Sequence, residues 1–179
     1  VDNLLKPDLV APGNKIVGAL ASDKAGAGGS WNYLAGNYAV LSSPFGGSGQ
    51  RGNETLMNLS GTSIAAPAVT GTVALMLQAN PGLTPPLVKA ILQYSAQPIA
   101  GANLLQQGAG LLNVNGAIAL ARALRTDIAA KITAGTIAAG NSLLASKSTK
   151  MPVTTSTING SSFNWSRIAF VGGNTVASG

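Results

Sequence analysis

The chain has 179 residues, of which 46% are hydrophobic and only 9% are charged, and the composition therefore disfavours disorder throughout. Its 23 glycines, with many small side chains, indicate close-packed layers joined by tight turns rather than a charged helical bundle. The absence of cysteine excludes disulfides, thiolate metal sites and a cysteine nucleophile.

The charge balance argues against a nucleic-acid partner. Eleven basic residues stand against five acidic ones, which gives a net charge of +6. The basic residues are scattered along the chain, without the clustering and interleaved aromatic side chains that a nucleic-acid-binding surface requires. This pattern is typical of a dilute, solvated surface. The chain also lacks histidine, which removes the most frequent general base from these residues.

The first part of the chain predicts extended segments and loops. Residues 6–13 read as an extended segment that ends in a Pro-Gly turn. Ile16 to Ala21 form a short apolar run with β-branched side chains, which predicts a strand. The stretch 22–55 is rich in glycine, serine and asparagine and predicts turns and loops, with a short strand at Val40-Leu41.

The longest apolar stretch predicts a helix from Ser63 to about Gln78. It is apolar on nearly every side, which is typical of a buried helix. Pro67 is expected in the first turn, where the missing N–H costs no helical hydrogen bond. The stretch is too short, and too often interrupted by proline, glycine and threonine, to be a good membrane span.

Two further helices are predicted. Thr84 is a natural N-cap for an amphipathic helix that ends at about Ala96. Residues 97–110 predict a loop, and a third helix is expected at about 115–125. Composition then changes near Thr126, after which serine, threonine and glycine alternate with short apolar runs. This last part predicts a β-prone extension or linker.

The turn before the longest helix carries the strongest chemical signal. Ser60-Gly61-Thr62 places Ser63 at a helix N-terminus, where unpaired N–H groups and the helix dipole favour a developing negative charge. Such a serine still needs a base before it becomes a strong nucleophile. The same residue pattern also makes an ordinary N-cap, and the spacing by itself leaves both interpretations open.

Three segments in one order resemble the subtilisin-like serine proteases (subtilases). Gly61-Thr62-Ser63-Ile64-Ala65-Ala66-Pro67 is similar to the nucleophile motif of that family. Upstream, Lys6-Pro7-Asp8-Leu9-Val10-Ala11-Pro12-Gly13 resembles its extended Pro-Asp segment. Downstream, Gly108-Ala109-Gly110-Leu111-Leu112-Asn113-Val114 resembles the segment that closes its catalytic domain. The resemblance covers roughly the first two-thirds of the chain.

The resemblance implies an α/β fold and a domain division. Residues 1–125 would be the C-terminal part of a three-layer (α/β/α) catalytic domain with a parallel sheet. Residues 126–179 would be an extension, or the start of a second module. This sequence departs from the family pattern in two places. It has Ala68 where the family frequently has histidine. Its stretch between Gly13 and Gly61 is also longer than in compact family members, which indicates an insertion around 24–55.

The resemblance also implies an activity, serine endopeptidase, through a Ser-His-Asp triad whose chain order is Asp, His, Ser. Ser63 would be the nucleophile, and Ser60, Gly61 and Thr62 would bind the substrate backbone. The triad Asp and His and the oxyanion-hole Asn would lie upstream of Val1, so this chain alone is expected to be inactive. The alternative is a catalytically inactive binding or structural module that kept the subtilase fold.

The remaining expectations concern partners and cofactors. The resemblance implies a polypeptide substrate, a partner in the missing N-terminal part of the same catalytic domain, and a secreted or cell-surface location. It implies no required cofactor and leaves room for a structural calcium ion. Asp8 matches a position that assists a weak cation site in some relatives; the alternative is an aspartate in a surface turn.

Overall fold

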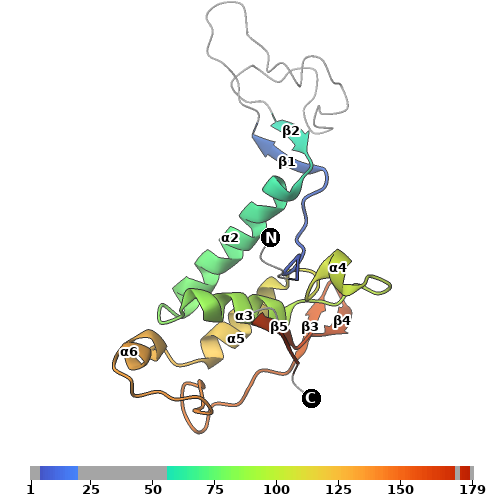
Figure 1. Ribbon diagram of the computed structural model, residues 1–179. Coiled ribbons are helices and arrows are strands. Elements are labelled where there is room, and N and C mark those ends of the chain that lie inside the picture. The colour runs from blue at the N-terminus through green and yellow to red at the C-terminus, as the bar shows by residue number, and fades with distance from the viewer. Residues whose placement is uncertain (1–4, 20–55, 172–173, 178–179) are drawn as a thin grey trace, which may run out of the picture. The chain divides into compact units, whose positions relative to one another are not determined.

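The computed structural model describes residues 5–19, 56–171 and 174–177 (Figure 1). Contacts divide the chain into two compact units. The smaller unit is Pro12–Pro67, and the larger one combines Val1–Ala11 with Ala68–Gly179. The strand expected at Val40-Leu41 and the expected insertion lie outside the described residues.

The smaller unit is built on one antiparallel strand pair. β1 (Ile16–Ala19) pairs with β2 (Leu56–Leu59), and Ile16 stands opposite Leu59. The prediction of a strand that begins at Ile16 is confirmed over these residues. β2 continues through a short turn into helix α2 (Thr62–Ala79), so the strand pair holds the start of the helix.

Helix α2 confirms the predicted helix, with one correction to the placing of its proline. The first helical hydrogen bond runs from the Ala65 N–H to the Gly61 carbonyl, at 3.2 Å. Pro67 therefore lies in the second turn and not in the first. Because proline has no N–H, the carbonyl of Ser63 receives no helical bond from residue 67.

The expectation that this helix is buried is wrong for the described residues. Only Thr72 and Met76 are buried along α2, whereas Leu75 and Leu77 are 45% and 40% exposed. Apolar composition shows what a helix is able to bury, but it does not supply the covering layer. By length and hydropathy α2 also suits a membrane span, but core helices of soluble proteins meet the same criteria, which makes this weak support for a span.

The two other predicted helices are confirmed with small shifts. α3 (Pro85–Ser95) follows Thr84, which has the extended backbone of an N-cap but makes no side-chain capping bond. α5 (Val114–Ala123) begins earlier than expected because Asn113 caps it, its side chain accepting the Gly116 N–H at 3.1 Å.

Two short helices were not predicted. α4 (Leu104–Gln107) lies within the expected loop, and Asn103 and Gln106 form a reciprocal capping box at its start. α6 (Ile128–Thr133) lies in the part expected to be β-prone. Six residues give less than two turns of periodic pattern, which is too little for a helix signal to stand out from a strand signal.

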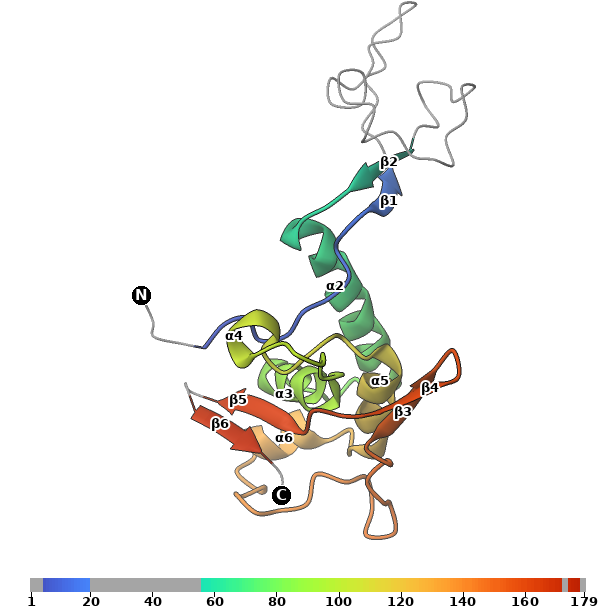
Figure 2. The ribbon, with the colours of Figure 1, turned by 90° about the vertical axis from the view of Figure 1, so that its right-hand side faces the viewer.

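The core of the larger unit lies between α3, α5 and the C-terminal segment, whose strands β3 and β5 lie beside these helices (Figures 1 and 2). Its buried members lie between residues 76 and 165: Met76, Leu83, Val88, Ile91, Leu92, Ala117, Leu120, Ala121, Leu124, Ile128 and Trp165.

The C-terminal segment forms two antiparallel hairpins, which confirms its β-prone character. β3 (Thr155–Ile158) pairs with β4 (Ser161–Asn164), and β5 (Ile168–Val171) pairs with β6 (Asn174–Ala177). All three ladders among the described residues are antiparallel, and the one parallel contact there is an isolated bridge. The described part of the chain therefore has the helices and small sheets of a mixed α and β protein, without a parallel layer.

The carbonyls at the end of α3 are bonded by distant segments. The Ser166 N–H donates to the Ala96 carbonyl at 2.8 Å, and the Arg167 N–H donates to the Tyr94 carbonyl at 2.9 Å. The Asn113 amide donates to the carbonyl between them, that of Ser95, at 2.8 Å. Because a helix leaves its last carbonyls unpaired, these three bonds fasten the C-terminal segment and α5 to the end of α3.

A buried glutamine joins both ends of the larger unit. Gln93 on α3 is fully buried, its amide donates to Asp8 Oδ1 at 3.1 Å, and its carbonyl oxygen accepts the Phe170 N–H at 3.0 Å. A buried amide is costly unless it is paired, so these two bonds make the docking of both segments interdependent.

Candidate functional site

The candidate nucleophile Ser63 is the second residue of α2. Its side chain is exposed, and among the described residues no group forms a hydrogen bond with its hydroxyl. The N–H groups of Thr62 and Ser63 precede the first helical hydrogen bond and so have no acceptor within the helix. The arrangement presents a hydroxyl and unpaired N–H donors together at the positive end of an eighteen-residue helix.

The backbone of the turn before Ser63 is held by the segment that precedes β1. The Gly61 N–H donates to the Gly13 carbonyl at 2.8 Å, and the Gly61 carbonyl in turn accepts from Ile64 and Ala65. Gly61 has a φ of +149°, a backbone conformation that side chains disfavour. A Cβ on Gly13 would lie 2.8 Å from the Cβ of Ala65, so the close approach of the two segments requires glycine there as well.

Two side-chain contacts extend this backbone contact. The Ser60 hydroxyl donates to Asn14 Oδ1 at 3.0 Å and accepts the Lys15 N–H at 2.9 Å. The sequence singled out Ser60, Gly61, Thr62 and Ser63. The structure places Ser60 and Gly61 in the turn before α2, and Thr62 and Ser63 are the first two residues of that helix. Nothing in the local sequence singled out Asn14, because its partner lies 46 residues away along the chain.

The residues that would activate Ser63 are not contained in this sequence. A Ser-His-Asp triad needs an imidazole within hydrogen-bond distance of the serine hydroxyl. The chain contains no histidine, so no rearrangement of its residues supplies that base. What the structure shows is an exposed serine at a helix N-terminus and the turn that precedes it.

Asp8 lies in an ion-paired cluster. Its Oδ2 is 2.7 Å from Lys6 Nζ, its Oδ1 is 2.8 Å from Lys89 Nζ, and Oδ1 also accepts from Gln93. Desolvation by partial burial raises the pKa of Asp8, but the hydrogen bonds and charges of the two lysines outweigh it and lower the pKa below its ordinary value of 3.8. A cation bound here would have to displace at least one lysine.

Side chains that ligate metals are not clustered elsewhere in the described residues. Among them, no group of three or more His, Cys, Asp or Glu side chains is placed to hold an ion. The donor set around Asp8 consists of ammonium and amide groups, which satisfy a carboxylate but do not ligate a cation.

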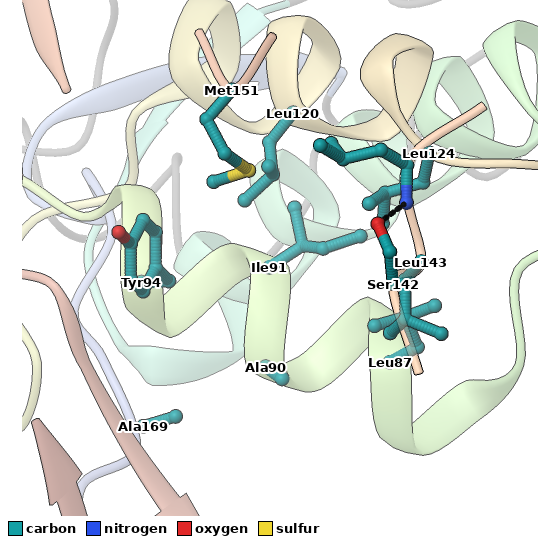
Figure 3. Close-up of a pocket in the computed structure, with 11 residues that line it drawn as sticks. Leu87, Ala90, Ile91, Tyr94, Leu120, Leu124, Ser142, Leu143, Met151 and Ala169 are labelled. Carbon is teal, nitrogen blue, oxygen red and sulfur yellow. Dashed lines mark hydrogen bonds between the residues drawn. The ribbon is translucent and has the colours of Figure 1, made fainter. Parts of the chain in front are cut away.

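An apolar cavity of about 410 Å³ lies between α3, α5 and the chain around residues 142–151 (Figure 3). The Ser142 hydroxyl at its edge accepts the Leu144 N–H at 3.2 Å. Its walls are mainly aliphatic, and they include Leu87, Ile91, Leu120, Leu124 and Met151. Its lining contains no Asp, Glu, His, Lys or Arg side chain.

Comparison with known proteins identifies the family. The model of the subtilase family matches residues 1–117. An extracellular protease of Xanthomonas campestris pv. campestris is 31% identical over 114 residues, which are 59% of this chain and 20% of the relative. Two relatives from Arabidopsis thaliana, the subtilisin-like proteases SBT2.3 and SBT1.6, are 36% identical over 94 residues and 31% over 101.

The matches cover only part of those relatives. The two Arabidopsis matches span 52% and 56% of this chain but 9% and 11% of the relatives. The chain therefore spans about a fifth or less of the length of the curated relatives it matches.

Proposed function

This chain belongs to the subtilase family of serine proteases, and on that premise we propose that it supplies the nucleophile, Ser63, of a serine endopeptidase. The observation that carries the proposal is the position of the Gly61-Thr62-Ser63 motif. It lies at the N-terminus of α2, where the Ser63 hydroxyl is exposed and is not used by a hydrogen bond to any described residue.

The proposed reaction is peptide-bond hydrolysis through an acyl-enzyme. The Ser63 hydroxyl attacks the scissile carbonyl, and an imidazole takes its proton and later gives it to the leaving amine. A carboxylate orients that imidazole. The Ser63 N–H, which precedes the first helical hydrogen bond, stabilises the oxyanion together with an asparagine side chain.

We propose that the imidazole, its carboxylate and the asparagine come from sequence upstream of Val1, in the same catalytic domain. The absence of histidine from the chain supports this assignment. It follows that residues 1–179 alone do not hydrolyse peptides. A purified 179-residue chain that cleaved a peptide anilide at a rate dependent on Ser63 would contradict the assignment.

The substrate is proposed to be a polypeptide whose backbone lies along Ser60, Gly61 and Thr62, beside the scissile bond. A glycine in this turn leaves room for the approach of a substrate backbone. The location is proposed to be extracellular or at the cell surface, in line with the Xanthomonas relative, which is named an extracellular protease.

No cofactor is proposed for the reaction, because acyl transfer of this kind needs only a base and oxyanion donors. A structural calcium ion is compatible with this proposal, but the ion pairs of Asp8 make that residue a poor ligand. Labelling of Ser63 should therefore persist in the presence of a chelator at a temperature at which the protein stays folded.

The test is active-site labelling of the intact protein with a fluorophosphonate. The wild type should be labelled on Ser63, and Ser63→Ala should abolish both labelling and peptide hydrolysis. Ser161→Ala is a matched control, since Ser161 is an exposed serine on β4 outside the motif, and it should leave labelling unchanged.

The second candidate, a non-catalytic module with the subtilase fold, is favoured by the missing histidine alone. It predicts an intact protein that binds peptides but is not labelled, and whose upstream sequence lacks the Asp and His motifs. Labelling that depends on Ser63 would exclude it.

A further inference from the structure

The Ser60 hydroxyl makes two hydrogen bonds within the fold. It donates to Asn14 Oδ1 at 3.0 Å and accepts the Lys15 N–H at 2.9 Å, so its one proton and one of its lone pairs are used. A substrate could recruit this hydroxyl as a donor only by breaking the bond to Asn14. The side chain of Ser60 therefore supports the turn, and its proton is not available to a substrate while that bond persists.

The segment opposite the turn is held in a strained conformation. Lys15 has a φ of +54°, in the left-handed region that a lysine side chain disfavours. Its N–H is the group that donates to Ser60. A strained residue persists only where its surroundings determine it, and strain of this kind is frequent next to functional sites.

The contacts of residues 13–15 reach the nucleophile through a short chain of bonds. Beyond the last β1–β2 pair, Ile16 with Leu59, the Gly13 carbonyl accepts the Gly61 N–H at 2.8 Å. The Gly61 carbonyl accepts the N–H groups of the two residues that follow Ser63. The position of Ser63 is thus set by Gly61, and the position of Gly61 is set by the 13–15 segment.

We propose that Asn14 and Ser60 form a positioning pair that holds the turn in the geometry in which the Ser63 hydroxyl and N–H act on a peptide carbonyl. The proposal rests on the assigned role of Ser63 as the nucleophile. Neither side chain touches the reacting atoms. Each acts through the backbone of the turn, and displacements well below 1 Å at a nucleophile reduce the rate without unfolding the protein.

The experiment compares variants of the intact protein on a short, uncharged peptide anilide, with kcat calculated per fluorophosphonate-labelled site. Asn14→Ala should lower kcat by about two- to tenfold, the range expected for one neutral hydrogen bond, with KM changed less than twofold. Ser60→Ala should have at least this effect. The double variant should match Ser60→Ala, because both changes remove the same bond.

Two further variants separate positioning from general stability. Ser60→Thr retains the hydroxyl and should restore kcat to nearly the wild-type value. Asn103→Ala is the matched control, since Asn103 is an exposed asparagine whose Oδ1 also accepts hydrogen bonds, but at the start of α4. It should leave kcat unchanged.

The outcomes are distinct. Two results together support the pair. Each single variant loses kcat per labelled site without a lower melting temperature, and the double variant loses no more kcat than Ser60→Ala does. Unchanged kcat, additive losses, or a lower melting temperature with unchanged kcat per labelled site overturns it. A wild-type protein that is not labelled on Ser63 refutes the proposed function instead, and the positioning role fails with it.

Discussion

Replacing Trp165 by alanine should destabilise the packing of α3 and α5 by about 4 kcal/mol. The indole is 3% exposed, its ring meets Tyr94 edge-on at 6.3 Å, and its N–H donates to Ser156 Oγ at 2.8 Å. Trp→Ala changes in cores cost about 3–5 kcal/mol, and an aromatic pair adds about 0.5–1.5 kcal/mol beyond its buried area. The Ser156 oxygen keeps a second donor, Asn113, so no orphaned acceptor adds to the loss.

Hydrogen exchange of the α5 amides measures this loss directly, because it reports the free energy of local opening. A change of about 4 kcal/mol should accelerate exchange about a thousandfold at amides whose exchange rate is set by the equilibrium of local opening. Trp165→Phe is the matched control. It keeps an aromatic ring in the core but loses the indole N–H and part of the buried ring volume, so a loss of about 2 kcal/mol, smaller than that of Trp165→Ala, is expected.

The same measurement tests whether residues 126–179 are a separate module. If Trp165→Ala accelerates exchange in α5 less than tenfold, the C-terminal segment does not stabilise the helices and the reasoning from its buried contacts is refuted. An independent module would instead show faster exchange within its own hairpins alone.

Three other predictions follow from local geometry. Gly13→Ala should reduce labelling of Ser63, because its Cβ would lie 2.8 Å from the Ala65 Cβ. Gly71→Ala has open space around its Cβ and should raise stability by up to about 1 kcal/mol. Labelling measures the first effect, and thermal unfolding measures the second. The 179-residue chain should bind a hydrophobic dye, and Leu75→Lys should weaken that binding, because Leu75 is 45% exposed; unchanged dye fluorescence would contradict this. Desolvation raises the pKa of Asp8, but the hydrogen bonds and charges of two lysines outweigh it, so the folded-state pKa is lowered. The ionised group therefore stabilises the fold above pH 3.8, and this stabilisation is lost as pH falls through the lowered folded-state pKa. Asp8→Asn should therefore be less stable than wild type at pH 6, by under about 1 kcal/mol, and equally stable near pH 2 in thermal melts.

Local sequence patterns predicted the elements that are long or clearly capped. The sequence predicted α2 from a long run that is apolar on nearly every side, and it predicted α3 and α5 from apolar residues at helical spacing over about three turns. Proline, glycine or asparagine signals flank each of them. α6 was missed because its six residues are surrounded by serine, threonine and glycine. α4 could have been found, since Asn103 and Gln106 have the spacing of a capping box.

Burial was harder to predict than helix formation. The sequence of α2 predicted a buried helix, whereas Leu75 and Leu77 are exposed in the described structure. A hydrophobic side chain stabilises the fold only when a partner surface covers it. The sequence of a helix does not show whether the chain contains that surface.

The sequence by itself determined the turn at Gly61 and the helix start that carries Ser63. Gly61-Thr62-Ser63 ahead of an apolar run specifies a tight turn and a helix start, and both depend on neighbouring residues only. The tertiary structure alone decided what supports that turn and the core. Asn14 reaches Ser60 across 46 residues, and Gln93 reaches Asp8 across 85 and Phe170 across 77. Such contacts depend on which distant segments the folded chain brings together, and the entropy lost in closing those long loops is offset only by the fold as a whole.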